Sequence, residues 1–172
     1  LRLIAGRAGS LVNVSELSRS LKIPATTVHR YMTFLETLFI LFPLESWSTN
    51  FTTRIIKSSK SYIVDSGMLA QLLGVTAERA LEEPDLIGSI MENFVVTELK
   101  KQASWSNTQT ELYYFRTASG IEVDIVLERP DGKIIGIEVK SSSSVQPRDT
   151  SGLKYLRDNV GDKWHRGIVL YT

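Results

Sequence analysis

Polar and apolar residues alternate along two neighbouring stretches, residues 121–128 and 134–140. Alternation with a period of two is typical of a β-strand that buries one of its faces. Between the two stretches, residues 129–133 contain a Pro-Asp-Gly run, which favours a turn. The pattern therefore predicts a β-hairpin with one apolar face and one face of charged side chains.

The register of this hairpin decides which charged residues meet, because a slip by one residue would turn every side chain to the other face. If Arg129 pairs with Lys133, Asp124 lies opposite Glu138. Two carboxylates directly opposite one another destabilise a sheet. A divalent cation between them would remove the repulsion, and Lys140 would lie on the same face as Glu138. The hairpin therefore predicts a metal site.

The hairpin is expected to belong to a larger sheet. The elements expected after residue 84 are a helix (86–102), a strand (112–116), the hairpin, a helix (149–159) and a strand (166–172). The last strand is a nearly continuous apolar run, which is typical of a strand buried on both faces. Glu92 lies on the first helix, outside the centre of its apolar stripe.

The first part of the chain predicts two helices, residues 14–21 and 25–38, separated by Ile23 and Pro24. This is a helix-turn-helix, and its second helix would be the recognition helix. Strands at 39–44 and 55–64 would complete a winged helix. The candidate DNA contacts are Thr27, Arg30, Arg54, Lys57 and Lys60. Many winged helices serve only in protein contacts, so the fold alone does not decide between the two roles.

Composition narrows the possibilities further. The 172 residues suffice for two small domains, and we predict a winged-helix domain over residues 1–84 and a second domain over residues 85–172. The formal net charge is +1, so affinity for nucleic acid would have to come from local patches. The absence of cysteine excludes disulfides, thiolate chemistry and cysteine-based zinc sites.

No apolar run approaches the roughly 18 residues that a membrane span requires, and no signal peptide is present. We therefore expect a cytoplasmic protein without a membrane partner. The chain begins at Leu1 and not at Met, so we expect a fragment of a longer protein.

The candidate site has oxygen ligands only, and such ligands select hard cations, Mg²⁺ or Mn²⁺. Such a cation polarises a phosphoryl oxygen and lowers the pKa of a bound water. A nearby lysine can orient that water or stabilise the developing negative charge. These parts suit hydrolysis of a phosphodiester.

Asp124, the run Glu138-Val139-Lys140 and a helix carrying Glu92 together resemble the PD-(D/E)xK nuclease superfamily. The resemblance implies a restriction-endonuclease-like α-β-β-β-α-β core in an α+β or α/β chain. It also implies that Asp124 and Glu138 are metal ligands, that the Val139 carbonyl is a third ligand, and that Lys140 assists the water. Glu92 matches the acidic residue that resolvase-like members carry on this helix. The resemblance therefore implies a catalytic role for Glu92.

Two observations qualify this assignment. Val123 stands where the superfamily has a proline, at a position that varies between members. Taken by themselves, Glu138 and Lys140 would be an ordinary surface ion pair, and Glu122 would be a further partner of Lys140.

A second resemblance covers nearly the whole chain. The phrases that carry it are YIVDSGML (62–69), GSIMENFVVTELKK (88–101), YYFRTASGIEVDIVLE (113–128) and IEVKSS (137–142). They resemble the C-terminal region of a family of prokaryotic AAA-type ATPases of uncertain function. The chain has no G-x-x-x-x-G-K-[ST] motif. The resemblance therefore implies that ATP is bound only by an upstream ATPase domain, which would also be a partner.

Two functional hypotheses follow. In the first, the chain carries a metal-dependent DNA nuclease domain next to a winged helix that binds or positions the DNA. In the second, it is a non-catalytic module that contacts DNA, its own ATPase domain or another protein.

Overall fold

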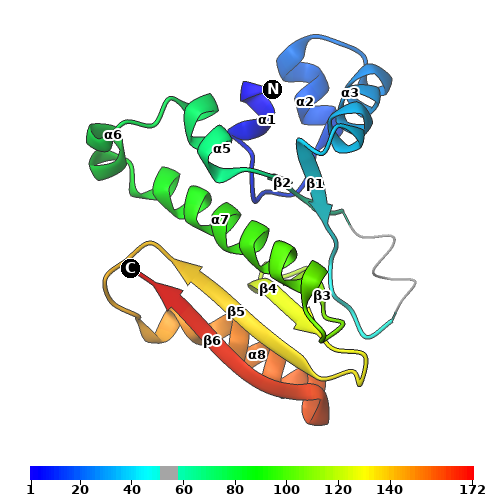
Figure 1. The fold of residues 1–172 in the computed structure, drawn as a ribbon, viewed down its shortest axis with the longest axis vertical. Helices are drawn as coiled ribbons and strands as arrows, with labels where there is room; N and C mark the ends of the chain where they lie inside the picture. Colours follow the sequence, from blue (N-terminus) through cyan, green and yellow to red (C-terminus); the bar gives the residue numbers. More distant parts are fainter. Residues whose placement is uncertain (51–57) are drawn as a thin grey trace.

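The computed structural model describes residues 1–50 and 58–172, with helices and two β-sheets (Figure 1). The N-terminal part contains α1 (Arg2–Ala5), α2 (Val14–Leu21), α3 (Ala25–Thr37), β1 (Leu41–Leu44), β2 (Lys60–Ile63), α5 (Ser66–Leu73) and α6 (Ala77–Glu82). The C-terminal part contains α7 (Pro84–Trp105), β3 (Glu111–Arg116), β4 (Glu122–Glu128), β5 (Ile134–Lys140), η1 (Pro147–Thr150), α8 (Ser151–Val160), η2 (Gly161–Lys163) and β6 (Trp164–Tyr171).

The two helices predicted in the N-terminal part are present. The side chain of Asn13 caps α2 by accepting a hydrogen bond of 3.0 Å from the Glu16 N–H. Lys22 ends the helix in the left-handed conformation, with a φ of 55°. The helices bury a shared apolar core, whose members include Leu17, Val28, Met32, Leu41, Ile63 and Leu69.

The two strands that follow α3 form an antiparallel pair in which Leu41 lies opposite Ile63. The first strand is shorter than expected, because Phe39 has a φ of 55°, which ends the helix and does not suit an extended strand. Of the second predicted strand, residues 60–63 form β2, and residues 55–57 lie outside the described part of the chain.

The C-terminal sheet has the strand order β3-β4-β5-β6, with β6 parallel to β5 and the other pairs antiparallel. The predicted hairpin register is confirmed along the paired residues. Ile125 lies opposite Ile137, and the Arg129 N–H donates a hydrogen bond of 3.0 Å to the Lys133 carbonyl. The order helix, three strands, helix and strand is also present.

The expectation that the hairpin buries only one face was wrong. Ile125 and Ile137 pack into one core cluster with Val96 of α7, whereas Val126 and Ile134 pack into a second cluster with residues of α8. Helices therefore cover both faces of the sheet, with α7 above it and α8 behind it in Figure 1. A register shift between β3 and β4 contributes, because it interrupts the strict alternation of β4.

The expectation for the last strand was also wrong. The strand β6 lies at the edge of the sheet, and most of its residues are exposed, including Leu170 and Tyr171. The opposite edge is covered, because the Tyr114 N–H of β3 donates a hydrogen bond of 2.9 Å to the Glu45 carbonyl. An apolar run therefore marked an edge strand here and not a central one.

The helix α7 joins the two parts, lying between the N-terminal helices and the C-terminal sheet (Figure 1). Its Asn93 is fully buried and holds both backbone groups of Ile63. The Asn93 Oδ1 accepts from the Ile63 N–H at 3.0 Å, and its Nδ2 donates to the Ile63 carbonyl at 2.9 Å. Because buried amides must be paired, this contact fixes α7 against β2.

Candidate functional site

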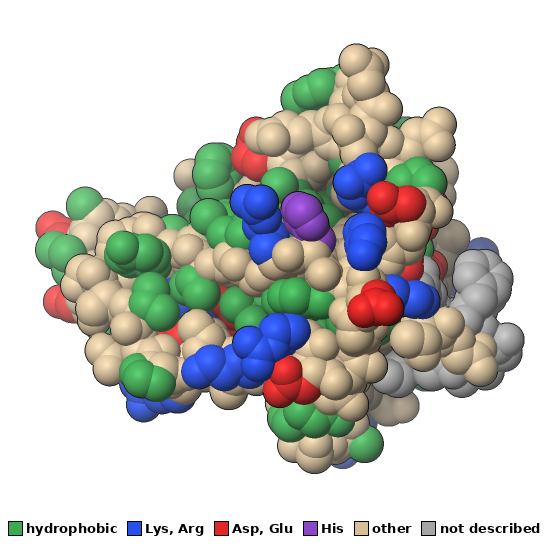
Figure 2. Space-filling model, turned by 90° about the horizontal axis from the view of Figure 1, so that it is seen from below, with side chains coloured by type: hydrophobic (Ala, Val, Ile, Leu, Met, Phe, Trp, Pro, Cys, Tyr) green, Lys and Arg blue, Asp and Glu red, His purple; other side chains and the backbone are tan. Residues whose placement is uncertain are grey.

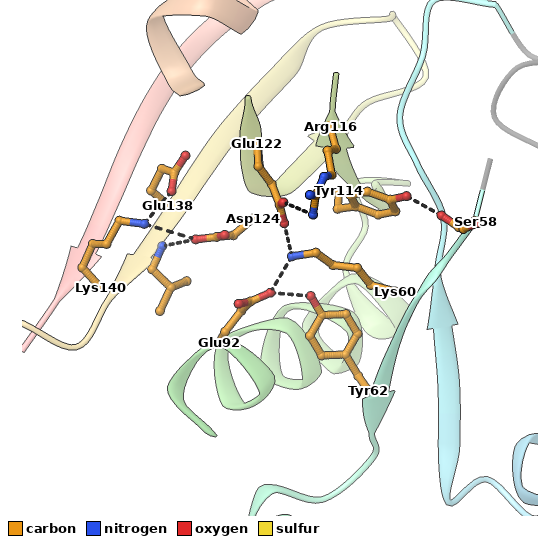
Figure 3. A network of polar contacts seen from close by, with 11 residues as sticks. Ser58, Lys60, Tyr62, Glu92, Tyr114, Arg116, Glu122, Asp124, Glu138 and Lys140 are labelled. Carbon is orange, nitrogen blue, oxygen red and sulfur yellow. Dashed lines mark hydrogen bonds and ion pairs between the residues drawn. The ribbon is translucent and has the colours of Figure 1, made fainter. Parts of the chain in front are cut away.

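Asp124, Glu138 and Lys140 meet where the β4–β5 hairpin ladder ends (Figure 3). The paired residues stop at Ile125 and Ile137. Beyond them the Asp124 Oδ2 accepts a hydrogen bond of 2.8 Å from the Val139 N–H. The Asp124 carboxylate thus takes the place of a strand partner, which fixes its position beside β5.

Lys140 lies between the two carboxylates of this group, which we call the acidic site (Asp124, Glu138 and Lys140). The Lys140 Nζ lies 2.9 Å from the Glu138 Oε2 and 3.9 Å from the Asp124 Oδ2. Glu138 is 5% exposed, and the side chain of Lys140 is 30% exposed. The acidic site therefore has a buried end at Glu138 and a solvent-facing end at Lys140.

The pKa of Glu138 is raised to about 8, mainly because the carboxyl group is buried and further because Asp124 lies close by. Lys140 opposes this shift, but one ammonium does not compensate two carboxylates. The pKa of Lys140 is itself raised, since the neighbouring carboxylates outweigh the effect of its burial. When both carboxyl groups are ionised, the site therefore has an excess of negative charge, which a proton or a cation can neutralise.

The N-terminal end of α8 closes the site from behind. A Cβ atom on Gly152 would lie 2.8 Å from the Glu138 Oε1 and 1.9 Å from the Glu122 carbonyl oxygen. The glycine is required here because the backbone of α8 approaches β4 this closely. This close approach accounts for the burial of Glu138.

A second group of residues, four charged residues and a tyrosine, lies on the other side of Asp124, and we call it the lysine cluster (Lys60, Tyr62, Glu92, Glu122 and Arg116). The Lys60 Nζ lies 3.0 Å from the Glu92 Oε1 and 2.5 Å from the Glu122 Oε1. The Tyr62 hydroxyl donates to the same Glu92 oxygen at 2.6 Å, and the Arg116 Nη1 lies 3.0 Å from the Glu122 Oε2. Figure 3 shows Asp124 between this cluster and Lys140.

In the lysine cluster, burial and the oppositely charged neighbours act in opposite directions on the pKa of Lys60 and on that of Glu92. Burial alone would lower the pKa of Lys60, but Glu92 and Glu122 outweigh it and raise the pKa above its usual value. Burial raises the pKa of Glu92, against the effect of Lys60, and Asp124 adds to the rise. Asp124 therefore acts electrostatically on both groups of charges.

The structure brings together some of the predicted site residues and separates others. Asp124 and Glu138 lie beside Lys140, as the register predicted. Glu92 does not join them, because Lys60 and Tyr62 hold its carboxylate. The backbone N–H of Val139 donates a hydrogen bond to Asp124, and the side chain of Val139 is buried.

The expected partner of Glu122 was wrong. Glu122 contacts Lys60 and Arg116, whereas Lys140 pairs with Glu138. The lysine cluster was missed in the sequence because its members come from β2, α7, β3 and β4. One signal was available: Lys60 and Tyr62 are two residues apart on a strand and so share a face.

The residues predicted to contact nucleic acid differ in how exposed they are. Arg30 is exposed on α3 and Thr27 is half-buried on the same helix. Lys60 is only 3% exposed and its ammonium faces two carboxylates. Arg54 and Lys57 lie outside the described residues.

The donors of the acidic site fit a hard cation. Across residues 1–50 and 58–172, no three histidine or acidic side chains are arranged to hold a metal ion. Magnesium, however, is commonly held by one or two carboxylates, with waters and substrate phosphates as its other ligands. Asp124 and Glu138 supply such a pair, and their uncompensated charge favours a cation.

The fold and the site define a mixed α/β protein with two carboxylates and a lysine at the end of a β-hairpin. The chain belongs to the family described as Domain of unknown function (DUF4143), which matches residues 87–172. A second family, described as Domain of unknown function (DUF8612), matches residues 1–79.

Two curated relatives are uncharacterized proteins, one from Mycobacterium tuberculosis and one from Mycobacterium bovis. Each is 34% identical to this chain over 142 residues, which is 83% of this chain and 31% of the relative. The chain thus spans about a third of the length of these relatives. No solved structure matches it. Within the described residues, no helix has both the length and the apolar character to cross a membrane.

Proposed function

We propose that residues 85–172 form a Mg²⁺- or Mn²⁺-dependent nuclease domain that hydrolyses phosphodiesters of DNA. The observation that carries the proposal is the acidic site, in which two carboxylates face a single ammonium, at 2.9 and 3.9 Å. This excess of negative charge beside a lysine is the arrangement that a hard cation and a phosphate require.

Each residue of the acidic site has a role in this proposal. Asp124 and Glu138 would hold the cation, which polarises the phosphate and acidifies a water when it is bound. The hydrogen bond from the Val139 N–H orients the Asp124 carboxylate toward β5. Lys140 is the most exposed of the three, so its ammonium can reach a phosphate or orient the water.

The arrangement of elements supports the same proposal. The order helix, three strands, helix and strand agrees with a restriction-endonuclease-like core of the PD-(D/E)xK type, with the acidic site on its second and third strands. The helices α2 and α3 and the pair β1–β2 agree with a winged helix. In this proposal the chain is part of an AAA-type ATPase. The ATPase domain would correspond to a region of the relatives outside the 31% of their length that matches this chain.

Contact with DNA would use local basic surface, since the net charge is only +1. Figure 2 shows Lys and Arg side chains gathered across one face of the molecule, with a few acidic ones among them. Exposed basic residues at the C-terminal end include Arg148, Lys154, Lys163 and Arg166. Arg30 adds an exposed charge on α3. Such contacts give affinity that falls as salt rises.

A second candidate function is a non-catalytic module that binds a protein or DNA. It is favoured by the state of Glu92, whose carboxylate is held by Lys60 and Tyr62 and so does not face the acidic site. The exposed side of α3 favours the same function, because Tyr31 and Phe34 of the helix and Leu38, which caps its C-terminal end, are about half exposed or more. Exposed apolar residues at helical spacing suit a protein partner better than a DNA groove.

A nicking assay on supercoiled plasmid separates the two candidates. Purified protein with Mn²⁺ or Mg²⁺ is expected to convert the plasmid to open circles, and EDTA is expected to stop the reaction. Lys140→Ala should reduce the rate by about 100-fold, within the range that a positioned catalytic group contributes. Lys133→Ala, which removes an exposed lysine at the other end of the hairpin, is the matched control. Equal nicking by wild type and Lys140→Ala would support the non-catalytic module.

A further inference from the structure

Lys60 is the least exposed charged residue of the lysine cluster, and it comes from a different part of the chain than its partners. It lies on β2, whereas Glu92 lies on α7 and Glu122 on β4. Its side chain is 3% exposed, and those of Glu92 and Glu122 are 19% and 26% exposed. An ammonium from the N-terminal part is thus inserted between carboxylates of the C-terminal part.

The position of this ammonium resembles that of a bound cation. The two carboxylates approach it at 3.0 and 2.5 Å, and Asp124 is near enough to raise its pKa as well. The Tyr114 ring lies beneath it, with the ring centroid 5.7 Å from the Nζ. Without Lys60, the carboxylates of Glu92, Glu122 and Asp124 would form one continuous negative region.

We propose that Lys60 is a positioning residue whose ammonium takes the place of a divalent cation between Glu92 and Glu122. By occupying that position it confines metal binding to Asp124 and Glu138, an assignment that rests on the proposed function. The N-terminal part thereby completes the charge balance of the C-terminal domain, and one divalent cation is bound per chain.

The neighbouring contacts support this role. The Tyr62 hydroxyl and the Lys60 ammonium bind the same oxygen of Glu92, and both come from one face of β2. Arg116 holds the second oxygen of Glu122. The carboxylates of Glu92 and Glu122 are therefore committed to residues of the chain, whereas Asp124 and Glu138 share a single lysine.

The test counts bound Mn²⁺ by isothermal titration at pH 8 for wild type and for Lys60→Met. Wild type is expected to bind one ion per chain. Lys60→Met is expected to bind a second ion, or to bind the first about tenfold more tightly, because a positive charge near the site has been removed. Lys60→Arg keeps the charge and Lys133→Met removes a remote lysine, so both should behave as wild type.

The possible outcomes test the role of Lys60 and the metal site at Asp124 and Glu138 separately. One ion with unchanged affinity in Lys60→Met would overturn the role of Lys60 and leave the acidic site intact. No ion in wild type but one in Lys60→Met would support the role of Lys60 and refute a metal site at Asp124 and Glu138. No binding by either protein would overturn both.

Lys60→Met leaves two carboxylates unpaired and can fail to fold, so a second variant is required. Glu122→Gln removes one partner of Lys60 at a partly exposed position. The charge of Lys60 then acts more strongly on Asp124, and Mn²⁺ affinity is expected to fall by about threefold or more. Unchanged or tighter binding in Glu122→Gln would overturn the proposal.

Discussion

The lysine cluster and the acidic site differ in how completely their charges are neutralised. In the lysine cluster, the two carboxylates Glu92 and Glu122 face the two cations Lys60 and Arg116. In the acidic site, two carboxylates share one lysine. The first arrangement holds two parts of the chain together, and the second leaves a negative charge to be neutralised. We infer that the balanced group serves structure and the unbalanced one serves binding.

The raised pKa of Glu138 reflects the excess of carboxylates over cations in the acidic site. Burial and Asp124 raise this pKa to about 8, so without a metal a proton removes the second negative charge of the acidic site. Glu92 is equally part of a buried group, but Lys60 opposes the shift of its pKa. Burial thus raises the pKa of both carboxyl groups, and in each case a neighbouring lysine opposes the shift.

The largest expected effect on stability comes from breaking the balanced group. Lys60→Ala leaves Glu92 and Glu122 in a largely buried place without their shared cation. Removing one partner of a buried ion pair typically lowers the free energy of unfolding by about 3–5 kcal/mol. Urea denaturation of the variant measures this loss. Lys133→Ala, an exposed control, should change stability by less than about 0.5 kcal/mol, and an equal small change in both variants would contradict the structural role of Lys60.

The next effect concerns the pH dependence of the unbalanced group. The pKa of Glu138 is raised from its ordinary value of 4.5 to about 8 in the folded protein, so the folded state binds a proton more tightly than the unfolded state. Its contribution to stability is therefore complete below about pH 4.5 and is lost as the pH rises through about 8. Thermal unfolding between pH 5 and pH 9 should show this decline.

Glu138→Gln is the matched control for this pH dependence, because the amide cannot titrate. The variant should show a flatter profile between pH 5 and pH 9. Mn²⁺ competes with the proton, so the stabilisation of wild type by Mn²⁺ should increase with pH and be absent in the variant. A wild-type profile as flat as that of Glu138→Gln would contradict the raised pKa.

The smallest expected effect comes from Arg116, the outer cation of the balanced group. Its side chain is 43% exposed, and exposed ion pairs contribute about 0–1 kcal/mol. Arg116→Ala should therefore lower the free energy of unfolding by less than about 1 kcal/mol, as measured in urea. A loss as large as that of Lys60→Ala would show that Arg116 contributes to the cluster as much as Lys60 does.

The sequence predicted the parts of the site that depend on local pattern. Alternation and the turn at residues 129–133 were enough to set the hairpin register, and with it the meeting of Asp124 and Glu138. The order of helices and strands after residue 84 was also predicted correctly. These features depend on periods of two or about 3.6 residues, which a single sequence displays.

What the sequence did not predict depends on contacts between distant segments. The partners of Lys60 lie 32 and 62 residues away, and no local period relates them. Burial of both faces of the hairpin depends on α8, which follows in the chain and covers Val126 and Ile134. The apolar pattern of β6 is the same for an edge strand as for a central one, so only the sheet order placed it.

The most direct test of the metal site is isothermal titration of Mn²⁺ into wild type and Asp124→Asn at pH 8. The substitution keeps an oxygen that can accept from the Val139 N–H and removes only the charge. Asp131→Asn, an exposed change in the hairpin turn, is the control. We predict one bound ion in wild type and in the control, and affinity at least about 30-fold lower in Asp124→Asn. No binding by wild type, or equal binding by Asp124→Asn, would contradict a cation site at Asp124 and Glu138.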